Sequence, residues 1–143
     1  MTCEEQASSP IGYFALACER MNGIARSLRE SSFFETVTTG ADIRYYQNGW
    51  RLEKWVEAEL DRTEGLWAVW WLELGPCENG WLVESNFGLN PQGLSVYLED
   101  RFAGSLSELE QHLSAAVEDL ELALEQNREF AEEVKKRRTS PDN

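Results

Sequence analysis

Three glutamates alternate along one strand-like run of this 143-residue sequence: Glu53, Glu57 and Glu59. Two carboxylates held close together can serve as acid and base, as they do in glycoside hydrolysis. However, the chain contains 26 acidic residues, so pairs of this kind arise by chance, and the solvated face of a strand accounts for the same spacing. We therefore assign no catalytic role to this run.

Few other residues could do chemistry. His112 is the only histidine, so a catalytic triad, a Cys-His pair or a two-histidine metal site would each depend on it. It follows Glu108 by four residues, which puts both on one helix face, where we expect a solvated pair. The cysteines Cys3, Cys18 and Cys77 lack the spacing of metal ligands. The sequence thus predicts a protein that is not an enzyme and binds no metal or cofactor.

Charge and composition limit the classes of partner. The formal net charge is −13, which repels nucleic acids and anionic membranes and either attracts a basic protein surface or only maintains solubility. Three unpaired thiols, no secretory signal and no apolar run of about 18 residues predict a cytoplasmic protein. The 42% hydrophobic content predicts one folded domain over residues 1–138, followed by a frayed tail over 139–143.

The periodicity of the apolar residues predicts an α+β fold. A helix is expected to start at Pro10 with Ser8 or Ser9 as its cap, and a long helix to start at a capping box of Ser105 and Glu108. Between residues 41 and 100, strand-like runs alternate with turns, including a type I′ turn at Asn48-Gly49. We expect an antiparallel meander of four or five strands, with both helices packed on one face.

The run GLWAVWWLELG, residues 65–75, is apolar on both faces of its strand. The helices are expected to cover the face that carries Trp50, Leu52, Val56, Trp70, Leu72, Leu94, Val96 and Leu98. The second face, here called the acidic–aromatic face, carries Glu53, Trp55, Glu57, Trp67, Trp71, Glu73, Leu82, Glu84, Tyr97 and Glu99. Either residues 31–40 or one helix covers it as a second core, or it is an interaction surface.

The strands NGWRLEKWVEAEL and GWLVES, the acidic charge and the long C-terminal helix resemble the immunity proteins of bacterial polymorphic-toxin and type VI secretion systems. That resemblance implies a protein that binds a cognate toxin domain and blocks it without performing chemistry. On an interaction surface, aromatic side chains would anchor a partner with a basic surface and carboxylates would pair with its Lys and Arg residues. The partner-binding residues predicted are Glu53, Trp55, Glu57, Trp71, Glu73, Glu84 and Tyr97.

Two alternatives remain at this point. A curved tryptophan-bearing sheet and the long helix could enclose an apolar pocket for a small molecule. The chain could also be an adaptor or homodimer that pairs through the tryptophan face or through the helix over 105–136.

Overall fold

The computed structural model describes residues 9–31, 34–47, 49–61, 66–90 and 94–139. Helix α2 (Pro10–Glu30) precedes four long strands and two short ones, and helix α3 (Leu106–Thr139) ends the described chain. The strands are β1 (Thr36–Tyr46), β2 (Gly49–Asp61), β3 (Leu66–Cys77), β4 (Gly80–Asn90), β5 (Leu94–Tyr97) and β6 (Arg101–Ala103).

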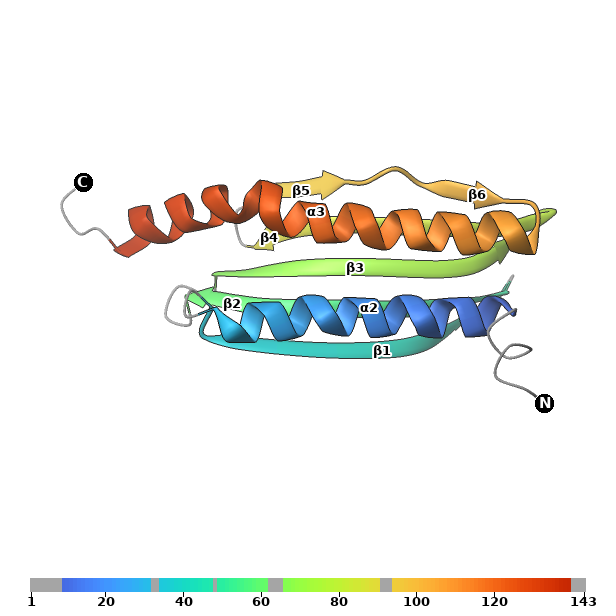
Figure 1. Cartoon of the computed structure of the whole chain (residues 1–143), viewed down its shortest axis with the longest axis horizontal. Helices are drawn as coiled ribbons and strands as arrows, with labels where there is room; N and C mark the ends of the chain where they lie inside the picture. Colours follow the sequence, from blue (N-terminus) through green and yellow to red (C-terminus); the bar gives the residue numbers. More distant parts are fainter. Residues whose placement is uncertain (1–8, 32–33, 48, 62–65, 91–93, 140–143) are drawn as a thin grey trace.

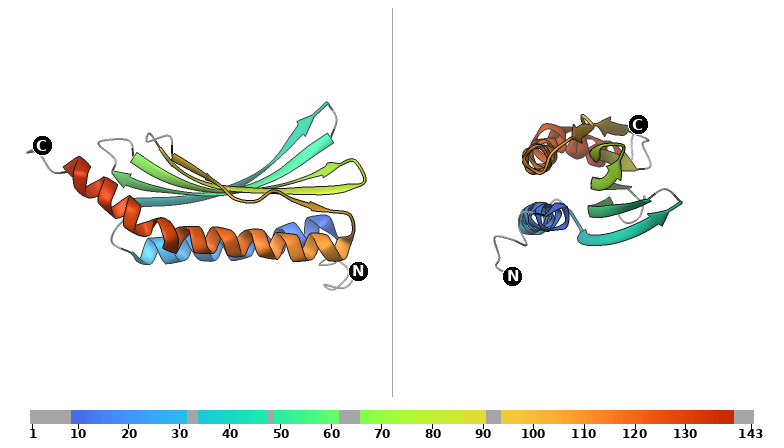
Figure 2. Two further views of the ribbon diagram at one scale, coloured as in Figure 1. Left: turned by 90° about the horizontal axis from the view of Figure 1, so that it is seen from above. Right: turned by 90° about the vertical axis from the view of Figure 1, so that its right-hand side faces the viewer.

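The strands form one antiparallel sheet in the order β1-β2-β3-β4-β5, and β6 also pairs with β4. Both helices lie on the same side of this sheet (Figures 1 and 2). Helix α2 packs against β1 and β2, and α3 packs against β4 and β6. The predicted α+β fold, a meander with an N-terminal helix and a long C-terminal helix on one face, is therefore confirmed.

The helix starts follow the predicted capping chemistry. The Ser9 hydroxyl accepts a hydrogen bond of 2.9 Å from the Gly12 N–H, with Pro10 in the first turn. At α3, the Ser105 hydroxyl accepts from the Glu108 N–H at 3.2 Å. The Glu108 carboxylate reaches the Gly104 N–H at 3.4 Å, so this cap resembles the expected box but closes one residue earlier.

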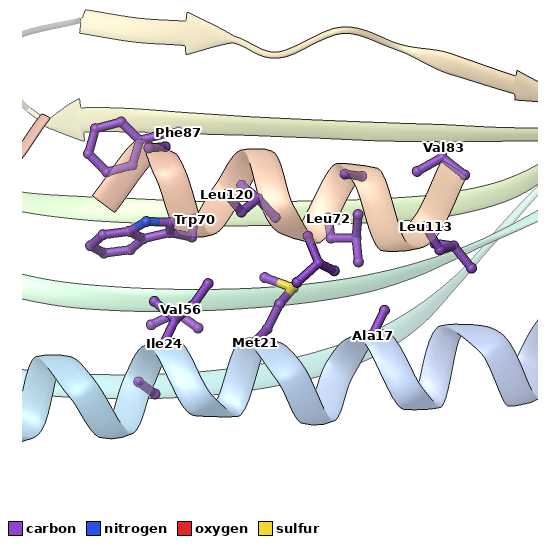
Figure 3. Close-up of a cluster of buried hydrophobic side chains, with 14 of the residues drawn as sticks. Ala17, Met21, Ile24, Val56, Trp70, Leu72, Val83, Phe87, Leu113 and Leu120 are labelled. Carbon is purple, nitrogen blue, oxygen red and sulfur yellow. The ribbon is translucent and has the colours of Figure 1, made fainter. Parts of the chain in front are cut away.

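The hydrophobic core lies between the helices and the sheet (Figure 3). Trp70 is 1% exposed, and its ring lies 5.0 Å from that of Phe87 in a tilted arrangement. Met21 and Leu120 reach this layer from the two helices. The predicted helix-facing strand residues Leu52, Val56, Trp70 and Leu72 are buried, Trp50 and Leu98 are half-buried, and the side chains of Leu94 and Val96 are outside the described ones. Each buried large apolar side chain contributes roughly 1.5–3 kcal/mol.

Three details of the strands and helices bear on what the sequence predicted. The first strand starts at Thr36, before residue 41 where the strand-like runs were expected to begin, and its partner β2 is long enough to pair with all of it. Gly49 has a φ of 149°, but the predicted turn type involves Asn48, outside the described residues. Among the described residues, neither helix carries the long apolar run that a membrane crossing requires.

Candidate functional site on the open face of the sheet

No described helix or strand lies over the acidic–aromatic face. Both helices are on the opposite side, and the hairpin ends bend away from them, so this face forms the inner side of the bend (Figure 2). Of the predicted cover over 31–40, the described residues from Thr36 onward do not cross this face, because they are β1 itself. The described part of the chain therefore supplies no second core.

The strand register gathers the predicted residues into neighbouring rows. In one row Glu53 lies opposite both Asp42 and Glu73, and Glu73 lies opposite Glu84. In the next row Trp55 lies opposite Trp71. Residues directly opposite each other in an antiparallel sheet share one face, so the carboxylates and the tryptophans are immediate neighbours.

Of the two remaining predicted residues, Glu57 lies in the row beyond the tryptophans and Tyr97 lies in the tryptophan row itself, on β5. Glu57 lies opposite Val69, one row beyond the tryptophans. Tyr97 occupies the register position opposite Asn86, which itself lies opposite Trp71, but its side chain is outside the described ones.

Trp55 and Trp71 form a stacked pair that is half-buried. Their ring centroids are 5.5 Å apart and their planes differ by 15°. The Trp71 indole N–H donates a hydrogen bond of 2.8 Å to the Glu73 carboxylate. Gly40 provides the space beneath the Trp55 ring, since a Cβ there would overlap the ring and lie 2.6 Å from its Cε2 atom. The stack and this hydrogen bond hold the two indoles in place relative to each other.

Glu53 differs from the prediction, because its side chain is buried and not available at the surface. It is 1% exposed, and the Arg44 Nε atom lies 3.1 Å from its Oε1 atom. This contact is an ion pair without a directed hydrogen bond, so neither carboxylate oxygen accepts one from the described residues. Burial raises the pKa of Glu53, Arg44 opposes that rise, and Glu73 and Asp42 add to it.

The other carboxylates remain partly accessible. Glu57, Glu73 and Glu84 are half-buried. Burial raises the pKa of Glu84, and the negative charges of Asp100 and Glu73 raise it further against the opposing effect of Arg51. The site therefore combines a fixed aromatic pair with a crowded row of negative charge.

Among the described residues, Arg44 and Arg51 bring positive charge to this face, and sequence reasoning gave neither of them a role in the site. Arg44 pairs with Glu53 from β1, and the Arg51 side chain lies over Gly75, where a Cβ would meet it. Alternation along β2 does put Arg51 on this face. The role of Arg44, in contrast, depends on the β1–β2 register, which a single sequence does not specify.

The other groups weighed in the sequence are the carboxylates, His112 and the cysteines. Within the described ranges, no three His, Cys, Asp or Glu side chains are arranged to hold a metal ion. Glu108 caps α3, and His112 is half-buried beside it on the same helix. Burial raises the pKa of the Cys18 thiol to about 11, which disfavours a reactive thiolate at neutral pH.

Two cavities are lined by residues that the structure describes, and no described residue of α3 lines either of them. One, of about 430 Å³, lies at the hairpin ends around Trp50, Arg51 and Pro76. The other, of about 350 Å³, lies between α2 and β1. Neither matches the expected pocket between the tryptophan sheet and the long helix.

Comparisons of this chain with protein-family models, with curated protein sequences and with solved structures gave no match.

Proposed function

We propose that this chain is a non-enzymatic cytoplasmic protein that binds and neutralises a partner with a basic surface, as immunity proteins do with toxin domains. The observation that carries the proposal is the fixed Trp55–Trp71 stack, set beside a row of carboxylates on a sheet face that no described element covers. Aromatic anchors of this kind supply large contact area at low entropic cost.

The charge of the chain supports a basic partner. A net charge of −13 accelerates the approach of a cationic surface over distances beyond contact. At contact, the partly accessible Glu57, Glu73 and Glu84 would pair with Lys or Arg side chains of the partner. We assign Glu53 a supporting role, because its buried carboxylate holds Arg44 and is not free to meet a partner.

Affinity capture from the native lysate tests this proposal when it compares matched variants. Trp71→Ala removes one half of the stack, whereas Leu122→Ala removes an apolar side chain that is 50% exposed on α3. We expect the wild type and Leu122→Ala to retain the same basic protein. Trp71→Ala should bind it more weakly by more than about 1 kcal/mol, about fivefold.

Circular dichroism must first show that both variants are folded. Equal retention of the basic protein by all three forms would contradict the proposed face. Loss of binding in Leu122→Ala alone would show that the partner binds to the helices and not to the acidic–aromatic face.

A further inference from the structure

Strand β1 forms an open edge of the sheet (Figures 1 and 2). Its 11 residues pair with β2, and no other described strand pairs with it. The Ile43 N–H donates to the Asp42 carboxylate at 2.8 Å, and the Val37 carbonyl accepts from the Arg29 guanidinium at 3.2 Å. Alternate residues of a strand direct their backbone groups to the same edge. The backbone N–H and C=O groups of the odd-numbered residues from 37 to 45 therefore point away from β2.

A shallow groove and exposed apolar side chains adjoin this edge. The cavity of about 350 Å³ is lined by Ile11, Phe14 and Cys18 of α2 and by Ala41 and Ile43 of β1. Ile11 is 66% exposed and Ile43 is 49% exposed, and Tyr45, two residues further along the strand, is 81% exposed. Apolar side chains beside unpaired strand groups favour the addition of another strand.

We infer that β1 pairs with β1 of a second copy of this chain, antiparallel and with Ile43 opposite Ile43, to form one continuous sheet. The segment Asp42-Ile43-Arg44 is self-complementary in this register. Asp42 lies opposite Arg44 of the second copy on the same face, and Arg44 lies opposite Asp42 of the second copy. Opposite charges at directly opposed strand positions stabilise a sheet, so the strand itself specifies an identical partner.

The structure favours this register over pairing centred on Ala41. An Ala41-centred pair would use Val37, whose carbonyl already accepts from Arg29, and would leave Asp42 opposite glycine. Pairing centred on Ile43 uses residues 41–45 and forms about six backbone hydrogen bonds. It also places Tyr45 of the second copy opposite Ala41, on the side where Ala41 lines the groove.

Two costs oppose the association. Asp42 must release the Ile43 N–H, which then donates to the Ile43 carbonyl of the second copy while Asp42 turns to Arg44 of that copy. Two chains of charge −13 also repel each other, although this repulsion is screened beyond about 8 Å at physiological ionic strength. We therefore expect a dissociation constant between about 1 µM and 1 mM.

The two-fold axis of such a dimer is perpendicular to the sheet, because directly opposed residues point to the same side. Both acidic–aromatic faces would then lie side by side on one surface. This inference rests on the β1 edge alone and does not depend on the proposed function.

Sedimentation equilibrium of the full chain at physiological salt tests the pairing. The average mass of the wild type should rise from 16.4 kDa toward twice that mass as its concentration is raised between about 1 µM and 1 mM. Asp42→Arg and Arg44→Asp should each weaken self-association at least about tenfold, because each puts like charges opposite each other. An equimolar mixture of the two variants restores both opposite-charge pairs and should dimerise at least as well as the wild type.

Tyr45→Ala provides a variant that leaves the buried Glu53 and its ion pair intact, and it should weaken self-association about fivefold or more. If Arg44→Asp does not fold, Tyr45→Ala is the variant that tests whether β1 pairs with β1 of a second copy. A wild type that stays at 16.4 kDa up to about 1 mM would overturn the inference. So would a mixture of the folded charge variants that associates no better than either alone, or a Tyr45→Ala variant that dimerises like the wild type.

Discussion

Replacing Gly40 with alanine should displace the Trp55 ring from its position over residue 40. The added Cβ would overlap that ring and lie 2.6 Å from its Cε2 atom. Crowding costs about 1–3 kcal/mol, and loss of the stack on Trp71 costs about 0.5–1.5 kcal/mol more. Replacing a flexible glycine in a strand stabilises the folded state by about 0.5–1 kcal/mol. The net result should be a fall of about 2 kcal/mol in the free energy of unfolding.

Urea denaturation followed by tryptophan fluorescence measures this change, and near-ultraviolet circular dichroism should show the loss of the stacked pair. Gly23→Ala is the matched control. The Cβ added there would lie 3.5 Å from an Arg26 side-chain atom, an ordinary contact, within a helix that alanine favours. That variant should gain about 0.5–1 kcal/mol.

A double-mutant cycle isolates the contact. In a Trp55→Ala background no ring lies over Gly40, so Gly40→Ala should cost nothing or be slightly stabilising. An equal loss of stability with and without the Trp55 ring would refute the placement of the ring over Gly40.

Two buried charged groups give further predictions. Because the pKa of Glu53 is raised on folding, the folded state retains its proton more strongly, and the stability due to this group should fall as pH rises from about 4 through the raised pKa. Glu53→Gln should flatten this pH dependence in urea titrations and be more stable than the wild type at pH 7. Glu118→Gln, on the exposed face of α3, is the control for the removal of one carboxylate. Burial lowers the pKa of Lys54, whose Nζ donates to the side-chain Oδ1 of Asn22 at 2.7 Å. Lys54→Met should therefore increase the free energy of unfolding by about 1 kcal/mol and raise the thermal midpoint. A lower midpoint would show that this hydrogen bond outweighs the burial of the charge.

The elements of the fold could be predicted because local signals specified them. Ser9 with Pro10 set the start of α2, and the apolar stripe set the buried face of α3. Lys54 lies between Leu52 and Val56 at a helix-facing position of β2, and it is buried and hydrogen-bonded to Asn22 of α2. Local chemistry of this kind acts within a few residues and is therefore visible in one sequence.

The details of the site could not be predicted, because they arise from pairing between strands. Strand alternation placed Glu53 on the acidic–aromatic face but gave no sign that Arg44, from the neighbouring strand, would approach it. Glu53 is 1% exposed, and its neighbours on this face, Asp42, Glu73 and Arg44, come from the two adjoining strands. Register and curvature are properties of several strands together, so a single run of residues does not reveal them.

The central claim is that one face of the sheet, and not acidity in general, recognises a basic partner. Titration of the captured partner with Glu57→Lys and Glu118→Lys tests it most directly, because both variants change the net charge equally. Glu57 lies beside the tryptophan pair, whereas Glu118 is exposed on α3. We predict that Glu57→Lys weakens binding by more than about 1 kcal/mol and that Glu118→Lys changes the affinity less than about twofold. Equal losses in the two variants, or no loss in either, would contradict the claim.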